Sequence, residues 1–227
     1  LKGIIWKYFS FCKTNTLPFS LVALSTFYIL FELSNTAVLM LFLFCLTTWF
    51  TSIQAFLKNI ISDDSIIVYS NKPNNIGLCK HSDAKTISSV IKNYSDYHSI
   101  AVIRNPYDWY VSWFMYRQRD KSRFSSKNMS FKEYLNEQPM KEILSWICDE
   151  NDNIIVDSII KYEDNFEEKI MNIISKKTSK NIISKIEKKN ISKKRENKDY
   201  KVYYDNETKK IVENLQSKTL QKFGYEF

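Results

Sequence analysis

Glycine is scarce in this chain: its 227 residues include three, at positions 3, 77 and 224. They lie too far apart for either the G-x-G-x-x-G dinucleotide fingerprint or the G-x-x-x-x-G-K phosphate loop to be written anywhere in the sequence. The same count excludes collagen-like and glycine-linker architectures. A nucleotide-binding protein with either glycine-rich loop is therefore excluded.

Cysteine and histidine are also few, and their spacing is uninformative for metal chemistry. No two cysteines form a C-x-x-C pair, and neither histidine lies at metal-ligand spacing from them; the cysteines are at 12, 45, 79 and 148 and the histidines at 81 and 98. This pattern predicts neither a zinc site nor a dithiol redox centre, and no metal cofactor. We expect free, mostly buried thiols in a reducing compartment.

Positive charge is in excess, because 33 Lys and Arg residues oppose 25 Asp and Glu residues and give a formal net charge of +8. Such an excess favours an anionic partner, which at this level is a nucleic acid, a membrane surface or a phosphorylated or sulfated ligand. A solvated lysine-rich surface without a partner explains the charge equally simply. Charge alone leaves these alternatives open.

The first 57 residues are unusually apolar. Between Thr14 and Leu57 the single charged residue is Glu32, which separates two apolar runs at 17–31 and 37–50. Each run is shorter than the ~20 residues of a membrane-spanning helix, but basic residues precede the first, as in a signal anchor. Residues 17–50 therefore either associate with a membrane or form a buried helix followed by a buried strand. The protein is accordingly membrane-associated or cytoplasmic, with residues 1–36 as an extension and 37–227 as the main domain.

Beyond residue 57, short apolar strands alternate with amphipathic helices. Strands are expected at 65–70, 98–103 and 153–162, and helices at 51–61, 82–92, 107–119, 130–135, 140–148, 165–176 and 207–223. Residues 177–201 are rich in Lys, Asn and Ser and are expected to form a loop. The alternation predicts an α/β fold with a mostly parallel sheet.

The most informative segment follows the strand at 98–103. Arg104 stands at the carboxyl end of that strand, where open α/β sheets bind ligands. Asn105 can cap the next helix, and Pro106 suits its first position. Ser112 lies six residues further, ~9 Å along the helix. A guanidinium, a hydroxyl and a helix N-terminus could together hold one phosphate. The simpler interpretation is an ordinary arginine ion pair at a strand end.

This segment and three others, in order along the chain, resemble the carbohydrate-type sulfotransferases, which use 3'-phosphoadenylyl sulfate (PAPS). The resemblance covers about residues 51–227. It is carried by Lys80-His81-Ser82-Asp83-Ala84, by Arg104-Asn105-Pro106-Tyr107-Asp108 with Ser112, by residues 156–164 ending in Tyr162-Glu163-Asp164, and by residues 190–227 with Ser192 and Tyr203-Tyr204-Asp205.

The resemblance implies a P-loop-NTPase-like three-layer sandwich with a mostly parallel central sheet. It implies transfer of a sulfuryl group from PAPS to a hydroxyl of a glycan or another acceptor, without metal or nucleic acid. Arg104 and Ser112 would bind the 3'-phosphate, and His81, which precedes a helix, is the expected general base. The 5'-phosphosulfate would be held by Thr48, Thr51 and Ser52, and the nucleotide covered by Lys194 and Arg195 with Lys193.

The phosphosulfate loop departs from the family pattern. Thr47 stands where a lysine is expected, and Trp49 and Phe50 replace small residues. A second locus at 12–16 supplies a lysine but lacks the following Thr-Ser-Ile. Two further functions therefore stay open: a catalytically impaired relative that binds nucleotide or glycan, and a membrane-anchored interaction protein. Glu163 could orient a loop lysine, act as a second carboxylate, or cap a helix.

Overall fold

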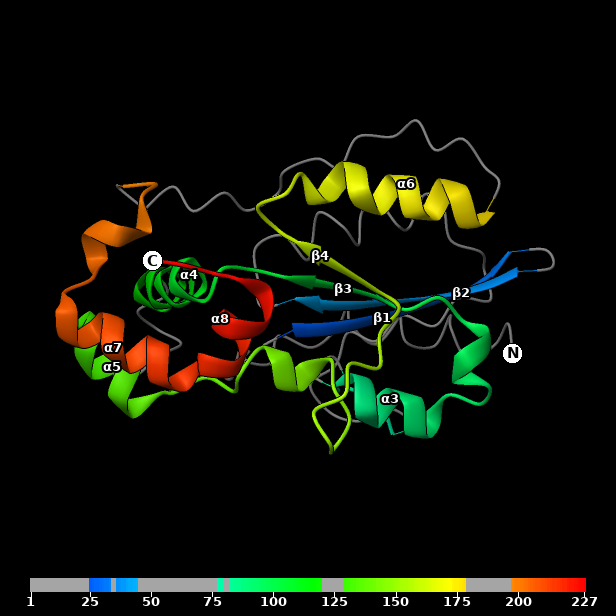
Figure 1. The fold of residues 1–227 in the computed structure, drawn as a ribbon, viewed down its shortest axis with the longest axis horizontal. Helices are drawn as coiled ribbons and strands as arrows, with labels where there is room; N and C mark the ends of the chain where they lie inside the picture. The colour runs from blue at the N-terminus through cyan, green and yellow to red at the C-terminus, as the bar shows by residue number, and fades with distance from the viewer. Residues whose placement is uncertain (1–24, 34–35, 45–76, 80–81, 120–128, 179–196) are drawn as a thin grey trace, which may run out of the picture.

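The computed structural model describes residues 25–33, 36–44, 77–79, 82–119, 129–178 and 197–227. Over this part of the chain it shows a mixed α/β fold with six α-helices and two pairs of strands (Figure 1). The strands are β1 (Ser25–Leu33), β2 (Thr36–Phe44), β3 (Ile100–Ile103) and β4 (Ser158–Lys161). The helices are α3 (Ala84–Val90), α4 (Pro106–Arg119), α5 (Phe131–Glu137), α6 (Phe166–Thr178), α7 (Asn206–Leu215) and α8 (Ser217–Phe223).

The two strand pairs differ in direction. β1 and β2 form an antiparallel hairpin in which Leu33 pairs with Thr36, whereas β3 and β4 are parallel, with Ile100 opposite Ser158. A parallel pair needs a crossover connection, and here that connection contains α4 and α5. Figure 1 shows the strands side by side with α6 on one side and α3 on the other. The α/β class is therefore confirmed.

The buried side chains form two groups, one on each side of β3. Ile100 and Val102 pack with helices α4 to α7, and the largest fully buried members of the molecule, Trp109, Tyr110 and Tyr134, belong to this group. Ala101 packs on the opposite side with Ile87 of α3 and with Ile147. The alternation follows from the two-residue period of a strand.

Local sequence signals explain most helix boundaries. Asp83 caps α3, and the buried residues of that helix include Ala84 and Ile87, whereas Val90 is 37% exposed. Capping boxes begin α5, at Ser130 with Glu133, and α7, at Asp205 with Thr208. Gly224 ends α8 in the left-handed conformation that favours glycine.

Several expected elements differ from those observed. Residues 25–33, most of which belong to the first apolar run, form a strand, not the buried helix of the core alternative, because this β-branched and aromatic segment pairs with β2. The strand expected at 153–162 is confined to β4, since a turn in which Asp149 accepts the N–H groups of Asn151 and Asn153 precedes it. Residues 51–61 and 65–70 lie outside the described residues, and the domain boundary at residue 36 stays a prediction.

The helix expected at 207–223 is broken into α7 and α8 at Gln216, a fully buried residue. Its side-chain oxygen accepts the N–H of Ile143 at 2.9 Å, and its amide nitrogen donates to the carbonyl of Lys141 at 3.3 Å. Thr219 accepts the N–H of Leu144 at 2.9 Å. These contacts provide hydrogen-bond partners for backbone groups of the segment 140–148. A helix was expected there, but the segment forms one 3-10 turn (Leu144–Trp146).

We expect Gln216→Leu to lower the free energy of unfolding by about 2 kcal/mol, because it leaves the buried N–H of Ile143 without an acceptor. Gln221→Leu, an exposed position of α8, is the matched control and should stay near wild type. Urea denaturation followed by circular dichroism measures both. Equal midpoints for the two variants would contradict the assigned role.

Candidate functional site

The candidate site lies at the carboxyl ends of the two parallel strands. β3 consists of four buried residues, and its last carbonyl, of Ile103, accepts the N–H of Tyr162 at 2.7 Å just beyond β4. The next residue is Arg104, so the pairing of β3 with β4 places Arg104 at this edge of the strands. This placement agrees with the expectation from sequence, since such edges are where open α/β sheets bind ligands.

Arg104 is 7% exposed and its charge is compensated locally. Its Nε donates to Oδ2 of Asp108 at 2.5 Å, and its Nη2 forms an ion pair with the same oxygen. The guanidinium carbon lies 4.9 Å from the ring centroid of Tyr162, a cation–π distance. The simpler interpretation of Arg104, an ion pair at a strand end, is thus present in the structure.

Tyr162 stays protonated beneath this charge. Burial raises the pKa of its phenol to about 12, although the positive charge of Arg104 acts in the opposite direction. A neutral ring is therefore in place over the whole physiological pH range. The stacking surface of Arg104 does not change with pH.

Asn105 forms the turn between β3 and α4. Its side-chain oxygen accepts the N–H of Tyr107 at 2.9 Å, and its carbonyl accepts the N–H of Trp109, the first helical bond of α4. The predicted cap is therefore confirmed, and α4 begins at Pro106, as expected. Asn105 also donates from its backbone N–H to Glu163 at 2.7 Å and from its side chain to the hydroxyl of Tyr200 at 3.3 Å.

The first two turns of α4 leave one polar stripe accessible. Of the eight residues from Pro106 to Trp113, Asp108 and Ser112 alone are half-buried, and the other six are buried. These two positions are four residues apart, so they lie on the same face, ~6 Å apart along the axis. Asp108 contacts Arg104, and Ser112 lies one turn further along the same face of α4.

Aromatic rings from three segments adjoin the turn. Tyr107 stacks on Tyr200 with their centroids 6.2 Å apart, and it meets Tyr204 and Phe227 edge-on at 5.7 and 5.0 Å. The hydroxyl of Tyr204 donates to the carbonyl of Tyr107 at 2.8 Å. Burial raises the pKa values of Tyr107 and Tyr204, so both phenols stay protonated. These ring contacts and the hydrogen bond from Tyr204 hold Tyr107, and with it the first turn of α4, in place.

The other predicted site residues lie outside the described part of the chain: Thr48, Thr51, Ser52, His81, Lys194 and Arg195. The proposed phosphosulfate loop with Thr47, Trp49 and Phe50 does too. The other histidine, His98, precedes β3 and has its Nε2 2.9 Å from Oγ of Ser158. Cys79 and Cys148 are free thiols, as expected, with Cys148 buried and Cys79 half-buried.

Three residues of this site were missed from sequence: Asp108, Tyr162 and Tyr200. The i,i+4 spacing of Arg104 and Asp108 was the available signal for the first. In the sequence, Tyr162 is noticeable only as the first residue of the Tyr162-Glu163-Asp164 triplet. Its place beside Arg104 follows from the register of β3 and β4. Nothing in the sequence connects Tyr200 with Asn105, 95 residues earlier.

Comparison of the chain with protein-family models, with curated proteins and with solved structures found no match. In the described ranges, none of the helices has both the length and the apolar character needed to cross a membrane.

We expect Asp108→Asn to lower the free energy of unfolding by roughly 3 kcal/mol, because it leaves the buried charge of Arg104 without its partner. Asp164→Asn makes the same change in the half-exposed pair with Lys169 and should leave the denaturation midpoint unchanged. Urea titrations at pH 7 compare the two. An Asp108→Asn variant as stable as Asp164→Asn would show that the pair contributes little.

Proposed function

We propose that this protein binds a 3'-phosphorylated adenine nucleotide at Arg104 and transfers a sulfuryl group from PAPS to a hydroxyl of a carbohydrate. The proposal includes a P-loop-like three-layer sandwich with a mostly parallel central sheet. The observation that carries it is the position of Arg104, a nearly buried cation at the carboxyl end of β3, directly before the N-terminus of α4, the helix that contains Ser112.

The guanidinium of Arg104 is chemically suited to an anionic group such as a phosphate. A guanidinium presents several N–H donors in one plane, and Nε and Nη2 are both directed at one oxygen of Asp108. The N-terminus of α4 adds a partial positive charge on the same side. A dianionic 3'-phosphate would draw on both, with the hydroxyl of Ser112 donating one further hydrogen bond.

In the proposed reaction the hydroxyl oxygen of the acceptor attacks sulfur. The new O–S bond forms as the bond between sulfur and the bridging phosphate oxygen breaks, and adenosine 3',5'-bisphosphate leaves. The hydroxyl proton goes to a general base, for which His81 is the candidate. Thr48, Thr51 and Ser52 would bind the 5'-phosphosulfate, and Lys194 and Arg195 would cover the nucleotide. No metal is required by this scheme.

A second function, binding without transfer, is favoured by the sequence of the phosphosulfate loop. Thr47 replaces the lysine that would stabilise charge on the bridging oxygen, and Trp49 and Phe50 oppose close approach of the backbone. Such a protein would keep the Arg104 site and bind the nucleotide or a glycan. The two functions differ only in whether sulfate is transferred.

We expect the full chain to bind adenosine 3',5'-bisphosphate in a calorimetric titration and Arg104→Ala to weaken that binding at least about 100-fold, since it removes the charge that pairs with the phosphate. Ser112→Ala should cost about fivefold, one hydrogen bond. Ser88→Ala, a half-buried helical serine of α3, is the matched control.

A double variant and a transfer assay separate an effect on folding from an effect on function. The double variant Arg104→Met/Asp108→Asn removes both charges together, so its loss of binding cannot be ascribed to a carboxylate left unpaired. Absence of binding by the intact chain would refute both proposed functions. Binding of the nucleotide, with no transfer of labelled sulfate from PAPS to a panel of glycans, would select the second.

A further inference from the structure

The segment that follows α8, residues 224–227, folds back over the candidate site. After α8 ends, Gly224 adopts the left-handed conformation, and the N–H of Tyr225 donates to the carbonyl of Leu220 at 3.1 Å. Figure 1 shows the segment running back over α4. It therefore lies at the carboxyl ends of β3 and β4, where Arg104 stands.

Two contacts of β4 hold the beginning of this segment. Nζ of Lys161, the last residue of β4, donates to the carbonyl of Phe223 at 2.6 Å. The same ammonium lies 4.8 Å from the ring centroid of Tyr225. One lysine thus satisfies the end of α8 and places the ring of Tyr225 beside the strand.

Glu163 connects the segment to the turn that carries Arg104. One carboxylate oxygen accepts the backbone N–H of Asn105 at 2.7 Å, and the other accepts the hydroxyl of Tyr225 at 3.2 Å. A carboxylate that accepts from two sides has a fixed orientation. Both of these hydrogen bonds come from neutral donors.

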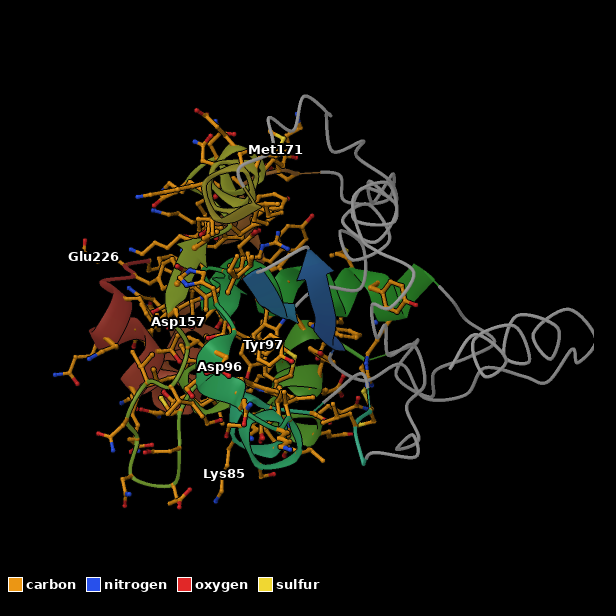
Figure 2. All side chains as sticks on the ribbon, turned by 90° about the vertical axis from the view of Figure 1, so that its right-hand side faces the viewer. Lys85, Asp96, Tyr97, Asp157, Met171 and Glu226 are labelled. Carbon is orange, nitrogen blue, oxygen red and sulfur yellow. The ribbon has the colours of Figure 1, made fainter. Side chains whose placement is uncertain are left out.

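The far end of the segment contacts the same turn from the other side. The ring of Phe227 meets that of Tyr107 edge-on, with centroids 5.0 Å apart. Between the two inward-facing aromatic residues, Glu226 is exposed, and Figure 2 shows it directed away from the fold. The segment therefore contacts the residues on both sides of Pro106, through Glu163 and through Tyr107.

We infer that Tyr225 is a positioning residue that acts through Glu163. By fixing the carboxylate, its hydroxyl holds the N–H of Asn105 and thereby the preceding guanidinium of Arg104 and the start of α4. Glu163 is itself exposed, so without Tyr225 its side chain has other rotamers open to it. Ligand-binding groups need a supporting contact of this kind to keep their geometry.

Amide hydrogen exchange of the full chain tests this directly, by NMR at a fixed pH. Tyr225→Phe removes one hydroxyl, and we expect the N–H of Asn105 to exchange at least about fivefold faster. The N–H of Ala101, which belongs to the hydrogen-bonded ladder between β3 and β4, serves as the internal reference and should be unchanged. Tyr94→Phe is the matched control, because Tyr94 donates to the carbonyl of Ile155, away from the turn.

If the N–H of Asn105 exchanges at the same rate in Tyr225→Phe as in the wild-type protein, the inference is overturned, whether or not the chain binds nucleotide. The same would follow if Ala101 exchanged faster to the same degree, since that indicates general loosening. Glu163→Gln, which keeps the shape and weakens the acceptor, should reproduce the effect of Tyr225→Phe.

A second measurement rests on the proposed function. If the intact chain binds adenosine 3',5'-bisphosphate, Tyr225→Phe should weaken binding about five- to tenfold while Tyr94→Phe does not. Equal affinity in wild type and Tyr225→Phe would show that the segment does not serve the nucleotide site. Failure of the intact chain to bind refutes the proposed function, and the exchange experiment still decides the role of Tyr225.

Discussion

The charge of Arg104 is the constraint around which the carboxyl edge of the parallel strands is arranged. A guanidinium with 7% exposure is costly unless its charge is compensated. Asp108 supplies the opposite charge, which requires that α4 begin at once after β3, and Tyr162 supplies the stacking surface, which the register of β3 and β4 places beside Arg104. The cap at Asn105 and Pro106 at the first helical position make that immediate start possible. Local sequence and buried charge thus support the same geometry.

The ion pair and the proposed ligand compete for one guanidinium. Asp108 occupies Arg104 in this structure, so a phosphate would share the guanidinium or displace the carboxylate. Sharing places two anionic groups close together, and the N-terminus of α4 offsets part of that repulsion. Asp108 would therefore reduce affinity for any anion while keeping the site ordered when empty. Affinity and stability make opposite demands on this residue.

The sequence predicted elements better than contacts. The β3–α4 unit was predictable because its signals are local: a β-branched run, a cap, a proline and an aromatic helix. The break at Gln216 was not, because it depends on an amide that bonds to the backbone of Ile143, 73 residues away. Glu163 shows the same limit. Its partners, Asn105 and Tyr225, lie 58 and 62 residues distant, and three roles were compatible with its sequence context alone.

The two ends of the parallel strands differ in the polar groups that they present. At the amino ends, faced by the view of Figure 2, Asp157 accepts from the N–H and hydroxyl of Ser99 and donates back to it, and His98 pairs with Ser158. Those groups satisfy one another within the strand pair. At the carboxyl ends, Arg104 and the half-buried stripe of α4 combine a positive charge with an accessible hydroxyl. A ligand at the carboxyl ends would add a hydrogen bond to Ser112, but at Arg104 it would have to share the guanidinium with Asp108 or displace that carboxylate.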